Sequence, residues 1–261
     1  MSAVAYHRPA SLAEAAKLAA GDPEARILAG GQSLLPSMKL GLLAPTAFID
    51  LGTLGELRGI RAERKSITIG AMTPHAAVAA SPEIIAAIPA LASLAAGIGD
   101  PQVRNRGTIG GSLANSDPAA DYPAAVLALN ATIRTNRRTL PADGFFTGLF
   151  ETALDAGEII TAVEFPVPSR AAYVKFPQPA SRFALVGVFV AQTSAGVRVA
   201  VTGAGPRAFR IKALEDALSR RFVPEACDGI PIPPDDLNTD IHASAEYRAH
   251  LIPVLARRAI A

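Results

Sequence analysis

The sequence predicts an α+β protein, in which short strands and alanine-rich helices are interspersed along 261 residues. Segments such as Ser66–Gly70 alternate polar and apolar side chains, which is typical of a strand that buries one face. Helix starts carry capping residues: Ser11 and Glu14 have the spacing of a capping box, ahead of an alanine-rich segment that runs to Ala20. With 50% apolar residues, the chain can build one large domain or two modest ones.

Residues 1–56 predict a small α/β unit. Its helix is expected to end near Gly21–Pro23, because glycine and proline interrupt helices. Ile27–Ala29 is expected to be the first strand and Ala47–Leu51 the next. Ser37–Leu43, between them, is expected to be a helical or irregular turn.

Residues 57–168 predict a second unit. Thr73 is expected to cap a helix whose first residue is Pro74, because proline fits the first helical turn. Gly144–Gly148 is expected to be a turn region. Further helical segments are expected at 81–83, 89–97 and 118–129, and strands at 66–70, 131–135 and 158–165.

The proline-rich stretch Pro166–Arg170 is expected to separate two domains, 1–168 and 169–261, the first with subdomains of about 1–56 and 57–168. Pro253 lies in the last predicted helix and should kink or split it, because proline removes a helical hydrogen bond. Beyond the boundary, strands are expected at 172–176, 183–191 and 197–201, helices at about 210–220 and 243–259, and irregular chain at 223–234.

Composition excludes several classes of function. The 25 basic and 23 acidic residues leave a net charge of only +2, and Trp is absent, so no nucleic-acid surface is expected. Residues 1–9 lack a signal-peptide pattern and no apolar run approaches the ~20 residues of a membrane span, so we expect a cytoplasmic protein. The single cysteine, Cys227, excludes an intrachain disulfide and a cysteine-built iron–sulfur or zinc site in this chain.

Two glycine segments are the strongest candidates for a ligand site. The first, Ala29–Pro36, has adjacent glycines after an apolar strand, a pattern that brings bare backbone N–H groups close to an anion. The second, Gly107–Asp121, has a glycine pair that is expected to follow a strand and a carboxylate at its end. A single glycine pair usually marks only a turn. The two together indicate one extended, phosphorylated ligand.

Other signatures are missing from the chain. It has neither the G-x-G-x-x-G fingerprint nor a P-loop, and no G-x-S-x-G nucleophile motif. His7, His75, His242 and His250 have no metal-ligand spacing, so surface or incidental polar roles are expected for them. The sequence therefore indicates a protein that binds a phosphorylated group carrying its own chemistry.

The two segments, with Arg104–Ser112 and Asp117–Asp121, resemble the FAD-binding medium subunit of the molybdenum hydroxylases, the family of aerobic carbon monoxide dehydrogenase and xanthine dehydrogenase. The resemblance covers nearly the whole chain. It implies a two-part FAD-binding domain of the vanillyl-alcohol-oxidase type, followed by a small C-terminal domain of antiparallel sheet and helices. Further similar stretches are 158–160, 173–175, 203–210 and 244–248.

The resemblance also implies cofactor-binding residues. Residues of the second segment would line the second phosphate and the ribityl chain, Asp121 would accept hydrogen bonds from sugar hydroxyls, and Lys175 would lie near the isoalloxazine. Ile98 and Ile160 would contact the flavin rings. The residues expected to wrap the pyrophosphate are Ile27, Leu28, Ala29, Gly30, Gly31, Gln32, Ser33 and Leu34, and those expected from the second segment are Thr108, Gly110, Gly111 and Ser112.

Some of these residues have simpler explanations. Asp121 is also expected at a helix start, Lys175 at a solvent-facing strand edge, and Ile98 and Ile160 in the core. Two positions depart from the family: Ser112 stands where many relatives have Asn or Asp, and Arg182 where an acidic residue is frequent. The second departure leaves the electron acceptor open among quinone, NAD and oxygen.

By resemblance, the chain is expected to carry electrons from an iron–sulfur partner through FAD to an external acceptor. The implied partners are a large subunit with the molybdenum cofactor and a small subunit with two [2Fe-2S] clusters, in a dimer of heterotrimers. Gln102–Arg106 is a candidate face for the iron–sulfur partner, or else a solvated basic turn. The alternatives are a flavin-less nucleotide-binding or scaffold subunit, and a stand-alone FAD oxidase.

Overall fold

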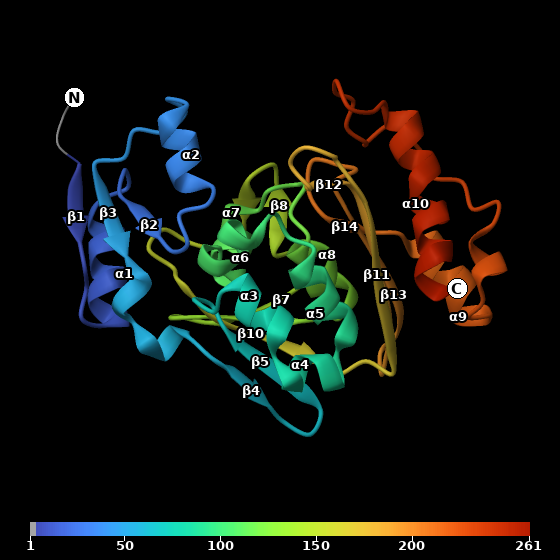
Figure 1. Cartoon of the computed structure of the whole chain (residues 1–261), viewed down its shortest axis with the longest axis horizontal. Coiled ribbons are helices and arrows are strands. Elements are labelled where there is room, and N and C mark those ends of the chain that lie inside the picture. Colours follow the sequence, from blue (N-terminus) through green and yellow to red (C-terminus); the bar gives the residue numbers. More distant parts are fainter. Residues whose placement is uncertain (1–3) are drawn as a thin grey trace.

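The computed structural model describes residues 4–261 and confirms the α+β class, so the first three residues of the 1–9 stretch lie outside it. The described chain has three main sheets and a two-stranded one. Figure 1 shows the N-terminal sheet at one end of the molecule, the β11–β14 sheet with α10 at the other, and the remaining elements between them.

The N-terminal unit is a three-stranded parallel sheet with β3 at its centre, between β1 and β2. The capping box is confirmed, because the Ser11 hydroxyl accepts a hydrogen bond from the Glu14 N–H at 3.2 Å. The prediction of Ile27–Ala29 as the first strand is wrong, because β1 precedes it and is too short to show alternation. The elements are β1 (Ala5–His7), α1 (Leu12–Gly21), β2 (Arg26–Leu28), α2 (Leu34–Lys39) and β3 (Ala47–Asp50).

The middle unit has a five-stranded antiparallel sheet in the order β4-β5-β10-β6-β7, with helices packed on it. Its strands are β4 (Ile60–Ala62), β5 (Ser66–Gly70), β6 (Thr132–Thr135), β7 (Thr139–Pro141) and β10 (Ile160–Pro166), with β8 (Phe146–Gly148) and β9 (Glu151–Thr152) as a separate pair. Two 3-10 helices, η1 (Leu51–Thr53) and η2 (Gly55–Leu57), pack in the N-terminal core and lead into this unit. Its helices are α3 (His75–Ala80), α4 (Pro82–Ala87), α5 (Pro89–Ala96), α6 (Pro101–Arg106), α7 (Ile109–Asn115) and α8 (Tyr122–Ala128).

Three predictions for this unit are wrong. Pro74 occupies the N-cap position of α3, while the Thr73 hydroxyl bonds to the backbone of Gly59 and does not cap the helix. Helix α8 begins at Tyr122, four residues later than expected. Residues 146–148, expected as a turn, form strand β8.

The C-terminal unit places one antiparallel sheet between two groups of helices (Figure 1). Helices α5 and α8 lie on one face, and α9 and α10 on the other. The predicted break at Pro253 is wrong in its stronger form, because α10 runs through Pro253 without splitting. The elements are β11 (Arg170–Pro177), β12 (Ala184–Thr193), β13 (Gly196–Thr202), β14 (Phe209–Arg210), α9 (Lys212–Arg220), η3 (Pro224–Cys227) and α10 (Ala245–Ile260).

Strand β12 is buried on both faces because helices cover both sides of its sheet. Phe189 and Ala191 belong to the core shared with the middle unit, whereas Val188 and Val190 belong to the core under α9 and α10. Side chains alternate across a strand, so neighbouring residues enter different cores. The sheet thereby ties the C-terminal helices to the unit that carries the second glycine segment.

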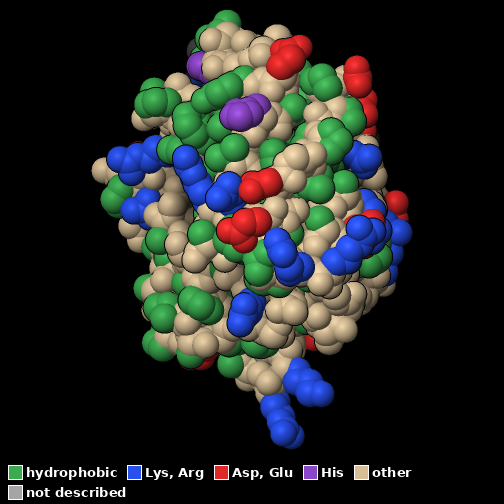
Figure 2. Space-filling view, turned by 90° about the vertical axis from the view of Figure 1, so that its right-hand side faces the viewer, with side chains coloured by type: hydrophobic (Ala, Val, Ile, Leu, Met, Phe, Trp, Pro, Cys, Tyr) green, Lys and Arg blue, Asp and Glu red, His purple; other side chains and the backbone are tan. Residues whose placement is uncertain are grey.

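The outer face of α9 and α10 is mixed in charge. Figure 2 shows basic and acidic side chains interspersed with apolar ones on this face. Several are paired, including Lys212 with Asp216 at 2.9 Å and Arg257 with Asp228 at 3.0 Å. Among residues 4–261, no helix is both long enough and apolar enough to cross a membrane.

Candidate cofactor site

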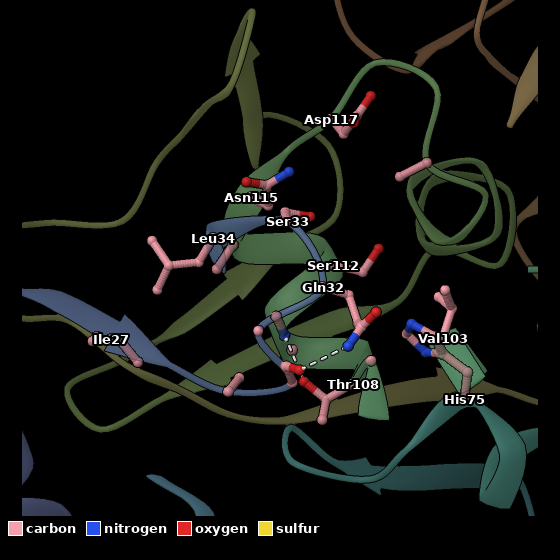
Figure 3. A pocket seen from close by; sticks show the side chains of 18 of the residues that line it. Ile27, Gln32, Ser33, Leu34, His75, Val103, Thr108, Ser112, Asn115 and Asp117 are labelled. Carbon is pink, nitrogen blue, oxygen red and sulfur yellow. Dashed lines mark hydrogen bonds between the residues drawn. The ribbon is translucent and has the colours of Figure 1, made fainter. Parts of the chain in front are cut away.

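The two glycine segments line one cavity of about 580 Å³. Its walls come from the N-terminal unit, the middle unit and the β11–β12 turn, so it lies where all three meet. All the predicted site residues line it except Leu28 and Lys175. In Figure 3, Gln32 and Ser33 of the first segment lie beside Thr108, Ser112 and Asn115 of the second.

The first segment has backbone donors that the described chain leaves unused. The N–H groups of Gly30, Gly31, Gln32 and Ser33 donate no hydrogen bond to any residue of 4–261. Gly31 has a φ of 71°, a left-handed conformation that glycine adopts without strain. Such a turn exposes consecutive N–H groups and suits oxygens that carry negative charge.

The first segment touches the second at Gly30. A Cβ on Gly30 would lie 2.2 Å from the carbonyl oxygen of Arg106 and 2.7 Å from the Cα of Gly107. Both distances are shorter than any real contact of that kind. Glycine is therefore required here for close approach of two backbones.

The second segment differs from the prediction, because its glycine pair follows helix α6 rather than a strand and lies inside α7. Its N–H groups are already bonded. Gly110 donates to the carbonyl of Ala71 at 2.8 Å, and Gly111 to the hydroxyl of Thr108 at 3.2 Å. This segment therefore offers side chains to the cavity, while the N–H groups of its glycine pair are already used.

Asp121 is a buried carboxylate with one oxygen engaged. Its Oδ1 accepts from the Tyr173 hydroxyl at 2.5 Å and pairs with Lys175 Nζ at 2.9 Å, whereas Oδ2 has no hydrogen-bond partner within residues 4–261. Burial raises the pKa of the Asp121 carboxyl, and the charge of Lys175 and the Tyr173 hydrogen bond oppose that rise. Asp121 stands at the N-cap of α8, as the simpler explanation expects, but its side chain does not cap the helix.

Lys175 does not line the cavity, and it is not a solvent-facing edge residue, because only 11% of its side chain is exposed. Besides Asp121, its Nζ donates to the carbonyls of Gly97 and Arg182, each at 3.0 Å. It therefore joins β11 to the end of α5 and to the β11–β12 turn, which is part of the cavity wall. Tyr173 and Lys175 reach the same carboxylate because residues two apart on a strand share a face.

His75 is a residue that the sequence interpretation missed. It was expected to have a surface or incidental polar role, yet it is 5% exposed and lines the cavity. Burial, with the nearby charge of Arg104, lowers its pKa to about 4. The available signal was its position at the start of α3, directly after the loop that follows β5, because loops that follow strands often carry site residues.

Glu158 is a second cavity-lining residue that was named only as part of a similar stretch. Arg138 holds it with hydrogen bonds from Nε at 3.0 Å and Nη2 at 2.8 Å. These bonds, together with those from Asp155 N–H and Thr135, lower the Glu158 pKa to about 2. Its charge is thus neutralised by the chain itself, which fixes the start of β10 and the adjacent Ile160 on the cavity wall.

Residues 2–168 match the family described as the FAD binding domain in molybdopterin dehydrogenase. The chain belongs to this family. It is 37% identical to the nicotine 6-hydroxylase medium subunit of Paenarthrobacter nicotinovorans, over 100% of this chain and 97% of that one. It is also 37% identical to the carbon monoxide dehydrogenase medium chain of Hydrogenophaga pseudoflava, over 98% and 95% of the two chains.

The solved structure of reconstituted CO dehydrogenase from Oligotropha carboxidovorans is similar with a TM-score of 0.91 at 32% identity, over 99% of this chain and 96% of that chain. The protein is thus an FAD-binding medium subunit of the molybdenum hydroxylases and a subunit of an FAD-dependent oxidoreductase. The family, the cofactor and the fold class expected from the resemblance are confirmed.

Proposed function

We propose that this medium subunit transfers electrons: it takes them from an iron–sulfur partner chain onto FAD and passes them to an external acceptor. The observation that carries the proposal is the cavity whose first segment, Gly30–Ser33, presents unused backbone donors. Bound FAD supplies the redox chemistry of the subunit. The role of the chain is to hold, orient and shield that cofactor.

The donor set fits FAD. The backbone N–H groups of Gly30–Ser33 bind the diphosphate, because amide dipoles neutralise an anion without a nearby cation. The free Oδ2 of Asp121 accepts from sugar hydroxyls, since a carboxylate attracts hydroxyl donors and repels phosphate. The apolar side chains of Ile98 and Ile160, which line the cavity, would cover the flavin ring.

Lys175 acts through Asp121. Its ammonium group pairs with Oδ1 and holds the carboxylate charged and oriented, so that Oδ2 stays available to the cofactor. We therefore replace the expected direct approach of Lys175 to the isoalloxazine with a positioning role. Removing the Lys175 charge should weaken FAD binding by acting on Asp121.

We further propose that the partners are a large molybdenum-cofactor subunit and a small [2Fe-2S] subunit, in a dimer of heterotrimers. The support is that the relatives are named medium subunits or medium chains. Residues 102–106, which lie within α6, stay the candidate face for the small subunit. The division into domains at 168, with a subdomain boundary near 56, and the cytoplasmic location also stay predictions.

The test is the visible spectrum of the chain co-expressed with its genomic neighbours, followed by release and identification of the flavin. We expect one FAD per chain together with iron–sulfur absorption. A folded but colourless complex would favour the flavin-less scaffold. If the chain alone reduced its flavin with a substrate, the stand-alone oxidase would be favoured instead.

A further inference from the structure

The His75 imidazole is a buried polar group without a partner. Its Nδ1 is fully buried and makes no hydrogen bond with any part of the chain that the structure describes. The ring packs against Tyr122, with centroids 5.3 Å apart, and the backbone N–H of His75 donates to the Gly107 carbonyl at 2.9 Å. His75 is thus held rigidly against the start of the second segment.

Buried polar side chains in folded proteins are nearly always hydrogen-bonded, because leaving one unpaired costs its full desolvation energy. His75 is one of the residues that line the cavity, so the small part of it that stays exposed faces the ligand space. In Figure 3 its ring points toward the side chain of Gln32, across the cavity. The other ring nitrogen, Nε2, also makes no hydrogen bond within residues 4–261 but is not fully buried, so it is the atom to which a ligand in the cavity can hydrogen-bond.

The charge of the imidazole limits which part of a ligand it suits. With its pKa lowered to about 4, His75 is neutral near pH 7 and offers one donor and one acceptor. A neutral group has little preference for a diphosphate, which the amides of the first segment already serve. It suits a carbonyl, a ring nitrogen or a hydroxyl.

We propose that His75 positions the cofactor by one neutral hydrogen bond to the flavin or ribityl half of FAD. The inference rests on the proposed function, because it requires FAD in this cavity. It assigns to α3 a direct contact with the cofactor. It also explains why an imidazole, and not an apolar side chain, packs behind Gly107. The contact is close: a Cβ added to Gly107 would lie 2.6 Å from Nε2 of His75.

The test compares three variants in the assembled complex. His75→Phe keeps an aromatic ring and removes the hydrogen bond, whereas His75→Gln keeps a side-chain donor and acceptor. Tyr122→Phe is the matched control, because it also removes a buried, unpartnered polar atom, and Tyr122 does not line the cavity. For each, FAD is removed and rebound, and the dissociation constant and flavin absorption bands are measured.

We expect His75→Phe to weaken FAD binding about tenfold and to shift the flavin bands, while His75→Gln and Tyr122→Phe stay within about threefold of wild type with unshifted bands. Wild-type affinity and bands in His75→Phe, or an equal loss in Tyr122→Phe, would overturn the inference. If His75→Phe does not fold, His75→Leu replaces it as the variant without the hydrogen bond, and His75→Asn replaces His75→Gln as the variant that keeps one. Equal FAD affinities in these two variants would then overturn the inference.

The proposed function and the role of His75 can be contradicted by different results. A wild-type complex without FAD would contradict both proposals. A wild-type complex that holds FAD, with His75 variants that hold it equally well, would contradict only the role of His75.

Discussion

Residues 29–33 and residues 107–112 both contain a glycine pair on the wall of the same cavity, and they use it differently. In the first segment Gly31 turns the backbone into the left-handed region, and neighbouring N–H groups donate to no residue of 4–261. In the second, Gly110 and Gly111 are helical, and their N–H groups are bonded to Ala71 and Thr108. The first segment is therefore the one that we propose binds an anion through its backbone, whereas the glycines of the second let other groups approach closely.

The difference separates two reasons for glycine. One is conformational freedom, needed at Gly31 because of its φ of 71°. The other is the absence of a Cβ, needed at Gly30 and Gly110, where that atom would lie within 2.5 Å of a neighbour. Substitutions that separate the two reasons test the comparison.

The largest effect is expected from Gly30→Ala. The new Cβ would meet the backbone carbonyl of Arg106 at 2.2 Å, and a backbone cannot move aside as a flexible side chain can. Overpacking of this kind costs about 1–3 kcal/mol or more and should separate the two segments, so the purified complex should lose most of its FAD. The FAD content per chain and the thermal unfolding of the purified complex measure these two effects. Gly21→Ala, which meets nothing within 4 Å, is the control; full FAD content in Gly30→Ala would show that the segments need no such contact.

Acid should destabilise the packing of α3 against the second segment, through His75. The unfolded chain binds the His75 proton with a pKa near 6.5 and the folded chain with one of about 4, so the folded state is fully stabilised above pH 6.5 and loses stability as the pH falls toward 4. The loss in the free energy of unfolding approaches about 3 kcal/mol. Urea unfolding at several pH values should show a shallower loss in His75→Gln. An equal slope in both proteins would refute this assignment.

Gly31→Val should weaken FAD binding strongly. A non-glycine residue in the left-handed region costs about 1–2 kcal/mol, and relaxing that strain would turn the N–H groups of the first segment away from the diphosphate. Gly41→Val is a matched control, because Gly41 has nearly the same φ, 73°, lies in open space and does not line the cavity. Both variants should lose similar stability without FAD, and only Gly31→Val should lose FAD affinity; equal affinities would place the anion site elsewhere.

The smallest effect is expected at Thr108. Its hydroxyl caps α7 by accepting from the Gly111 N–H, so Thr108→Val should cost about 1 kcal/mol of stability with or without FAD. Thr108→Ser keeps the hydroxyl and should therefore retain most of the wild-type stability. Calorimetric unfolding of the two variants, with and without FAD, measures this difference in stability. A loss seen only in the presence of FAD would mean that the hydroxyl serves the cofactor and not the helix.

Local signals were sufficient for much of the fold. The Ser11 capping box and the alternation at Ser66–Gly70 predicted their elements, because each depends on residues close in sequence. Strands β1 and β4 were missed, since with three residues each they are too short to carry a period. The helical state of Gly110 and Gly111 was also missed. It depends on carbonyls of Ala71 and Thr73, more than thirty residues away, which accept the first N–H groups of α7.

The sequence by itself determined the composition of the site: its two glycine segments, and Asp121 at the end of the second. It also determined the family, because those motifs are specific in combination. Only the tertiary structure decided which N–H groups lack a partner within residues 4–261, that Lys175 pairs with Asp121, and that Nδ1 of His75 is buried with no partner in the same residues. The reason is physical: burial and pairing depend on which distant backbones meet, and no local pattern specifies that.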